Sequence, residues 1–253
     1  MYQLPHEIVQ LVVYYVGDDQ DTLAALNRTN RALYNATLCT LYHAPSFTSV
    51  HQFRVFVENL SPKTASKVRK IDLKHLPHRW NAALSEHVMA LLRKADNINY
   101  LDLCLCRINQ RVSRLAIEKW PLQYLSLNSH RNVNDDLFAS LPSNCLENLL
   151  EVDLGETNIT DQSLMILADR CPKLNSLELE GCQHVTEVGI EYVTKKCQQS
   201  LKFLNIRDCF NVVPGPDNNL DGTHVVIDWA AWGFEDVIDD DDDDDDDNNN
   251  ENA

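Results

Sequence analysis

The chain has 253 residues, of which 44% are hydrophobic, and its formal net charge is −16 at pH 7. This hydrophobic fraction is typical of a soluble protein, and no apolar run is long enough to span a bilayer. The first residues lack a basic segment followed by a long apolar core, so we expect no signal peptide and no membrane partner. The 8 cysteines include no C-x-x-C pair, which favours reduced thiols in a cytoplasmic or nuclear protein over disulfides or zinc.

The negative charge is concentrated at the C-terminus. Twelve acidic residues, Glu235, Asp236, nine aspartates at 239–247 and Glu251, leave about −4 for the rest of the chain. A mildly acidic body argues against nucleic acid as the partner. Residues 235–253 are otherwise mostly asparagine, and we expect a disordered acidic tail because like charges repel one another.

Three short helices are predicted in residues 1–45. Leu4 and Pro5 begin the first, since proline is favoured at a first helical position. Asp21 or Thr22 is expected to cap the second helix. Helices this short bury little surface by themselves, so they require a partner, either the rest of the chain or another protein. Their apolar positions at helical spacing include Ile8, Leu11, Val12, Tyr15, Leu33 and Tyr34.

One pattern recurs in the second half of the chain. Leucines at 174, 177 and 179, followed by Cys182 and Val185, have counterparts at identical offsets 27 residues later. Those counterparts are Leu201, Leu204, Ile206, Cys209 and Val212. A fixed period with L-x-x-L-x-L and then Cys is the leucine-rich-repeat signature. Related triplets predict six strands, with starts at 68, 98, 122, 149, 174 and 201.

Each repeat predicts a strand, a turn and a helix. Residues 176–180 alternate polar and apolar, which indicates a short strand with Leu177 and Leu179 turned inward. Thr186 is an N-cap for the helix that follows. One unit cannot bury its inner leucines alone, so the units must stack. The pattern therefore predicts an α/β solenoid over residues 46–234, a right-handed horseshoe with a parallel concave sheet and terminal caps.

Other parts of this region are less regular. Residues 45–48 could form a first irregular strand, and Ser49 could cap the next helix. Residues 111–119 predict a helix of only one or two turns. An apolar segment at 223–234 is expected to close the last repeat. The repeat offsets predict that Cys106, Cys182 and Cys209 are buried, reduced and structural.

Residues 4–47 resemble an F-box. Leu4, Pro5, Glu7 and Ile8 match its opening L-P-x-E-I, and a later run contains Asn30, Arg31 and Tyr34. Together with the repeats, the chain is similar to F-box leucine-rich-repeat proteins of fungal type. The resemblance implies that residues 1–45 bind the Skp adaptor, and through it cullin. The adaptor-binding residues would be Leu4, Pro5, Ile8, Val12, Leu33 and Tyr34. The alternative is that these helices only cap the first repeat.

The strand residues between the inward leucines are expected to point out of the concave face. One interpretation is that acidic residues simply suit a solvated position there. The other is a binding face, with aromatic anchors beside carboxylates that favour a basic segment of a protein substrate. The residues of this predicted face are Asp72, Tyr100, Asp102, Tyr124, Ser126, Glu151, Asp153, Glu178, Glu180, Phe203, Asn205 and Arg207.

No constellation of residues indicates catalysis. The histidines and cysteines lack metal-ligand spacing, so no metal or cofactor is expected, and His184 near Cys182 is explained by the repeat. The favoured function is a non-enzymatic substrate receptor of a cullin-type (SCF) ubiquitin ligase, which serves ubiquitin-dependent proteasomal degradation. The alternative is a free-standing leucine-rich-repeat scaffold or inhibitor with a helical N-terminal cap.

Overall fold

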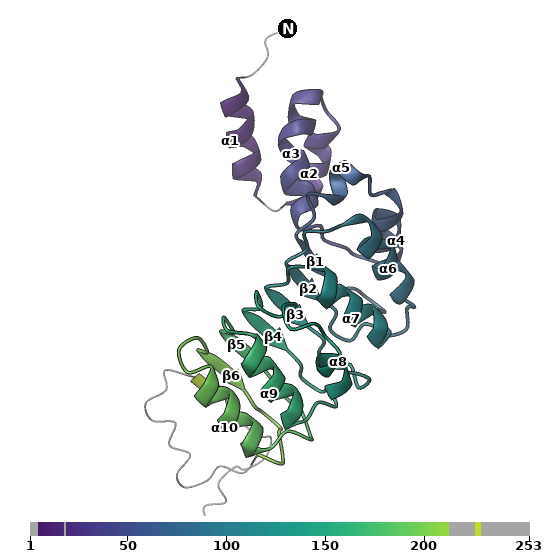
Figure 1. The fold of residues 1–253 in the computed structure, drawn as a ribbon. Coiled ribbons are helices and arrows are strands. Elements are labelled where there is room, and N and C mark those ends of the chain that lie inside the picture. The colour runs from purple at the N-terminus through teal and green to yellow at the C-terminus, as the bar shows by residue number, and fades with distance from the viewer. Residues whose placement is uncertain (1–4, 18, 213–225, 229–253) are drawn as a thin grey trace, which may run out of the picture.

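The computed structural model describes residues 5–17, 19–212 and 226–228. The fold mixes helices with a parallel sheet (Figure 1). The first elements are all helical: α1 (His6–Val16), α2 (Gln20–Asn27), α3 (Arg31–His43), α4 (Val50–Asn59) and α5 (Pro62–Ala65). Short strands then alternate with helices along the rest of the described chain.

The strands are β1 (Lys70–Asp72), β2 (Tyr100–Asp102), β3 (Tyr124–Ser126), β4 (Glu151–Asp153), β5 (Ser176–Glu178), β6 (Phe203–Asn205) and β7 (Val226–Asp228). The helices between them are α6 (Ser85–Lys94), α7 (Gln110–Lys119), α8 (Asp135–Ala139), α9 (Asp161–Arg170) and α10 (Glu187–Lys196).

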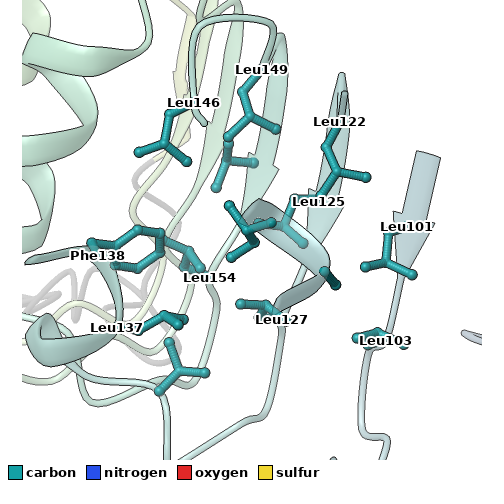
Figure 2. Packing of buried hydrophobic residues seen from close by; sticks show 14 of the residues in the cluster. Leu101, Leu103, Leu122, Leu125, Leu127, Leu137, Phe138, Leu146, Leu149 and Leu154 are labelled. Atoms are coloured by element: carbon teal, nitrogen blue, oxygen red, sulfur yellow. The ribbon is translucent and has the colours of Figure 1, made fainter. Parts of the chain in front are cut away.

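Each strand pairs in parallel with the next in chain order, and the helices follow the same order along one side of the sheet (Figure 1). The register places Leu101 opposite Leu125, and Leu125 opposite Val152. These inward positions are fully buried, as the period-two pattern predicts. Figure 2 shows the leucines of successive strands facing the interior, with Leu137 and Phe138 of α8 opposite them. The six predicted strands are confirmed.

The first three helices have a small core of their own. Val9, Val13, Leu23 and Ala36 form it, and none of them belongs to the larger core of the repeats. The predicted cap of α2 is wrong: Asp19 is the N-cap, and its carboxylate accepts hydrogen bonds from the N–H groups of residues 21 and 22, both at 3.1 Å. Both predicted capping residues therefore lie inside the first turn.

Phenylalanines cover the open end of the repeat core beside α4. Phe53 is fully buried, and Phe47 and Phe56 pack against the same core, with ring centroids 5.1 Å apart. Ser49 caps α4, as predicted, and accepts a hydrogen bond from the N–H of Gln52 at 3.2 Å. Residues 45–48 form no strand, because Phe47 turns inward to this aromatic cluster and no neighbouring strand pairs with the segment.

The helix predicted to be short at residues 111–119 is a full α7 of ten residues. Asn109 caps it, and its side chain accepts a hydrogen bond from the N–H of Arg111 at 2.7 Å. Val112, Ala116 and Ile117 give it a buried face. The predicted cap at Thr186 is confirmed, since its hydroxyl accepts from the N–H of Val188 at 3.3 Å.

Side chains also tie neighbouring units together. The Trp120 indole donates to the carbonyl of Ala95 at 2.9 Å, and Lys94 Nζ donates to the carbonyl of Val57 at 2.8 Å. Arg170 donates to the carbonyl of Leu141 at 2.9 Å. Each contact satisfies a backbone oxygen near the end of the preceding helix or loop. A unit is therefore held by polar contacts as well as by shared apolar core.

None of the helices in the described ranges is long and apolar enough to cross a membrane. Of the predicted terminal cap at residues 223–234, only 226–228 are described, and they form β7, which pairs with β6. The rest of that cap and the predicted tail at 235–253 lie outside the described residues.

Candidate functional site

One face of α1 exposes apolar side chains. Val9 and Val13 face the small helical core and are 4% exposed, whereas Ile8, Leu11 and Val12 are 43%, 49% and 38% exposed. Positions four apart lie on the same side of a helix, so Ile8 and Val12 form one apolar strip beside the buried stripe. Pro5, the N-cap of α1, is also exposed. The predicted adaptor residues of α1 therefore remain accessible, while Leu4 lies outside the described residues.

The two predicted adaptor residues of α3 differ from each other. Leu33 is half-buried, because it packs against the small helical core. Tyr34 is more exposed, and Lys63 Nζ lies 5.5 Å from the centroid of its ring. Much of Leu33 is therefore used inside the helical cluster, and the open apolar surface of this part of the chain lies mainly on α1.

Two tyrosine rings stack on each other on the predicted concave face. The sheet register places Tyr100 opposite Tyr124, and their rings are parallel within 4°, with centroids 4.0 Å apart. Lys70 Nζ lies 4.0 Å from the centroid of Tyr100 and pairs with Asp72 at 3.2 Å. One face of the stack therefore already holds a cation. Lys70, which the register places opposite Tyr100, was not among the residues predicted for this face.

The last residues of strands β2, β3 and β6 on this face are more buried than a solvated position would be. Asp102, Ser126 and Asn205 are all buried, and Asp102 is only 1% exposed. The hydroxyl of Tyr124 donates to Asp102 Oδ2 at 3.2 Å, and the N–H of Cys104 donates to Asp102 Oδ1 at 2.9 Å. The interpretation that acidic residues here occupy a solvated position does not hold for Asp102, because the Tyr124 hydroxyl and the N–H of Cys104 contact its carboxylate.

Burial changes the protonation behaviour of this cluster. Burial raises the pKa of Asp102, and the hydrogen bond from Cys104 opposes this only in part. Burial also raises the pKa of Tyr100 to about 12 and raises that of Tyr124. Both phenols are therefore neutral hydrogen-bonding groups at neutral pH.

A second polar cluster follows on β3 and β4. Asp153 accepts hydrogen bonds from the Ser126 hydroxyl at 2.9 Å, from Asn128 Nδ2 at 3.1 Å and from the N–H of Gly155 at 3.1 Å. A Cβ at Gly155 would lie 2.5 Å from Asn128 Nδ2 and 3.1 Å from the carbonyl oxygen of Glu180, so any other residue here would have to displace the Asn128 amide. The carboxylate of Asp153 is thus fixed, with limited freedom to move toward a ligand.

The remaining predicted residues lie toward β6. Burial, followed by the charge of Asp153, raises the pKa of Glu178. Glu180 accepts a hydrogen bond from Asn205 Nδ2 at 3.4 Å, and Asn205 Oδ1 accepts from the N–H of Arg207 at 3.0 Å. Glu151 of β4 is exposed. Phe203 of β6, which lies two strands away in the same row of the sheet, is half-buried. The structure therefore brings the predicted face together as a continuous row of strand positions, with Glu151 its most accessible carboxylate.

The three cysteines predicted to be structural are buried and unpaired by disulfides. Cys182 Sγ donates to the carbonyl of Leu154 at 3.1 Å, and Cys209 Sγ donates to the carbonyl of Leu179 at 3.0 Å. Burial raises the pKa of Cys182 to about 11 and that of Cys209 to about 12. The thiols of Cys182 and Cys209 therefore each satisfy a backbone oxygen of the preceding unit.

Within the described ranges, no group of three or more histidine, cysteine, aspartate or glutamate residues is arranged to hold a metal ion. His75 and His78 lie in the loop between β1 and α6, where His78 has a left-handed φ of 59°.

Comparison with known proteins places the N-terminal part in a family. Residues 1–79 match the family model of the COS11 F-box domain, so this stretch is an F-box domain, as its motifs predicted. The match continues past α3 through α5 and β1.

A curated relative has the same kind of domain. The F-box protein COS111 of Candida glabrata is 40% identical over 75 residues, which are 29% of this chain and 8% of that protein. The chain therefore spans only a small part of the length of this relative. Among solved structures, a chain of the crystal structure of the Rad7 and Elc1 complex in yeast aligns with a TM-score of 0.39 and 13% identity. That alignment covers 82% of this chain and 77% of the other.

Proposed function

We propose that this protein is a substrate receptor of a cullin-type ubiquitin ligase. Its F-box helices, residues 1–45, bind a Skp-type adaptor that connects them to cullin. The following units form a leucine-rich-repeat horseshoe whose concave face holds a protein substrate. The chain is not itself an enzyme in this proposal, and its contribution is proximity between the substrate and the ligase.

The exposed apolar strip of α1 is the observation that carries the adaptor half of the proposal. Exposed isoleucine, leucine and valine on one helix cost free energy in water, by roughly 25 cal/mol for each Å² of apolar area. An exposed apolar strip on an F-box domain favours a protein surface as its partner. Pro5, Ile8 and Val12 are the described residues that would supply the contact.

The alternative, that these helices only cap the first repeat, is less compatible with the packing. A cap would share its apolar residues with the core that it closes. Val9, Val13 and Leu23 instead belong to a separate core, and in the three helices Tyr42, near the end of α3, is the residue that packs against the repeat core. The exposed apolar residues of α1 are therefore available to a second protein.

The tyrosine stack supports the substrate half of the proposal. Aromatic rings and carboxylates together favour a cationic side chain, and Lys70 of the chain itself already lies on Tyr100 in this way. Glu151 lies opposite Tyr124 on the next strand and is exposed. A lysine or arginine of a substrate would contact the open side of this pair. We therefore propose a basic segment as the recognised element.

Co-purification with the adaptor tests the proposal. The full chain is expressed with an affinity tag in fungal cells. The adaptor and cullin that co-purify are measured for the wild-type protein and for the Ile8→Asp/Val12→Asp variant. Two carboxylates on the exposed strip should abolish recovery of both partners, because each would be buried unpaired in the interface.

The matched control is His6→Asp/Gln10→Asp. These residues are exposed, lie on the opposite flank of the same helix and are likewise four apart. This variant should retain both partners, and circular dichroism should show that both variants remain folded. Full recovery of adaptor by Ile8→Asp/Val12→Asp would refute the proposal and leave a free-standing scaffold or inhibitor as the better description.

A further inference from the structure

A second exposed surface lies on the turns that follow the first three strands. The loop from β1 to α6 is the longest strand-to-helix connection in the described chain, and it exposes Trp80 by 49%. In the next unit Leu105 is 41% exposed and has a left-handed φ of 57°. An indole and a leucine held open to water on adjacent turns are unusual for a surface without a partner.

Two arginines stand beside these apolar side chains at equivalent positions. Arg107 lies seven residues after Tyr100, and Arg131 lies seven residues after Tyr124. The sheet register pairs these two tyrosines. Neighbouring strands lie about 4.8 Å apart, so the two arginines lie on adjacent turns. Both residues are exposed, and neither makes a salt bridge within the described part of the chain.

This pairing has an energetic consequence. Arginine stays protonated at all physiological pH values, so two guanidinium groups that line the same hollow repel each other. An anion placed between Arg107 and Arg131 would relieve the repulsion and accept hydrogen bonds from both side chains. The neighbouring His130 does not add to the charge, because its ring is buried and burial lowers its pKa.

Trp80 is held in place rather than left loose. Arg79 lies 5.7 Å from the centroid of its ring, and Arg79 Nε donates to the carbonyl of Cys104 at 2.7 Å. The contact joins the loop of one unit to the turn of the next. A shallow hollow of about 430 Å³ lies between them, and its lining includes Trp80, Leu105, Arg107, Ile108 and Arg131.

We propose that this surface, the arginine edge (Trp80, Leu105, Arg107 and Arg131), binds an acidic protein segment that carries a large apolar side chain. Carboxylates match the planar fork of arginine, and the apolar residue would enter the hollow beside Trp80 and Leu105. The proposal is independent of the concave face and of adaptor binding, since it involves neither set of residues.

Nucleic acid would also meet arginine and tryptophan, but the surroundings disfavour it. The carboxylate of Glu156 accepts a hydrogen bond from Ser129, a residue that lines the same hollow, at 3.0 Å. A nucleic-acid strand carries a charge at every phosphate and would meet Glu156 beyond the two arginines, whereas a peptide can place an uncharged residue there.

Fluorescence anisotropy with the full chain tests the proposal. The probe is a labelled EDELEDFEEL peptide at low salt, and a labelled single-stranded oligonucleotide of ten thymidines is the second probe. The peptide should bind wild type and lose about tenfold in affinity with Arg107→Gln/Arg131→Gln, as expected for two partly exposed charge pairs. Trp80→Ala should weaken binding severalfold, and binding should decline as salt rises.

The matched control is Arg31→Gln/Arg93→Gln, which removes the same charge from two exposed arginines elsewhere. It should bind the peptide like wild type, and melting curves should confirm that all variants are folded. Equal peptide affinity for the two double variants would overturn the proposal, as would binding of the oligonucleotide in preference to the peptide. A full-length variant with asparagine at 239–247 provides the last comparison. If only that variant bound the peptide, the chain's own acidic run would be the occupant, and the proposed partner segment would be rejected.

Discussion

A carboxylate at the start of α8 links one unit to the next, and removing it should weaken the array. Asp135 accepts hydrogen bonds from the N–H and hydroxyl of Thr160, at 3.0 and 2.7 Å, and from the N–H of Ser163 at 3.2 Å. The Ser163 hydroxyl also donates to it. Burial raises the pKa of Asp135, but the hydrogen bonds from Ser163 and Thr160 outweigh burial and hold the pKa below its usual value of 3.8.

Asp135→Asn keeps the shape of the side chain but removes its charge, and it turns one acceptor into a donor that faces other donors. Hydrogen bonds to charged groups contribute about 1.5–3 kcal/mol each. Those made by Asp135 share one group, and the carboxylate is partly exposed to solvent. We therefore discount the sum to a loss of about 2 kcal/mol in the free energy of unfolding at pH 7. Urea unfolding followed by far-ultraviolet circular dichroism measures it.

The loss should depend on pH in a defined direction. A carboxylate whose pKa is lowered by folding contributes fully above its unfolded pKa, about 3.9, and loses that contribution as pH falls through the lower folded value. The difference between wild type and Asp135→Asn should be constant from pH 7 to pH 5 and should narrow below about pH 4.

Asp136→Asn is the matched control, because Asp136 lies on the same first turn and is exposed. It removes the same charge from the helix N-terminus and should change stability by less than about 0.5 kcal/mol. A loss for Asp136→Asn equal to that for Asp135→Asn would attribute the effect to the helix dipole. A difference that persists unchanged to pH 3 would show that the charged hydrogen bonds do not carry it.

Three further changes test the packing. The buried Ser113 hydroxyl has no hydrogen-bond partner among the residues that the structure describes, so Ser113→Ala should raise the free energy of unfolding by about 1 kcal/mol, measured by urea titration; a loss would contradict this. Gly189→Ala should lower the melting temperature although alanine favours helices, because the new Cβ would lie 2.9 Å from Leu164 Cδ1 and closer to Asp161; an unchanged melting temperature would refute the clash. With Ellman's reagent, exposed Cys39 should react at once, while Cys182, whose pKa burial raises to about 11, should react only on unfolding; rapid reaction of both would be inconsistent with the buried position.

Features repeated at fixed offsets could be predicted from the sequence. The inward leucines, the Thr186 cap and the buried cysteines each recur at the same place in successive units, and their partners lie in the same or the adjacent unit. Local chemistry and a period are sufficient for such positions. The F-box could be recognised because its motif residues are close together in the chain.

The missed features depend on contacts between units. Nothing near Asp135 indicates that its acceptors serve Thr160, which lies 25 residues later. The burial of Asp102 depends on the ring of Tyr124 from the following strand. The arginine edge was missed for another reason. Equivalent residues of successive repeats were aligned along the strands but not along the turns that follow them. Continuing the same alignment past the strands would have placed Arg107 beside Arg131.

The strict order of the sheet gives the protein an adjustable length. Each strand contacts only its predecessor and its successor, so one unit could be added or removed without altering the interior of any other. Every such change would alter the span of the array by one strand spacing, about 4.8 Å. Under the proposed function, insertion of whole units between β1 and the tyrosine stack would move the bound substrate away from the adaptor in regular increments and with the same fold.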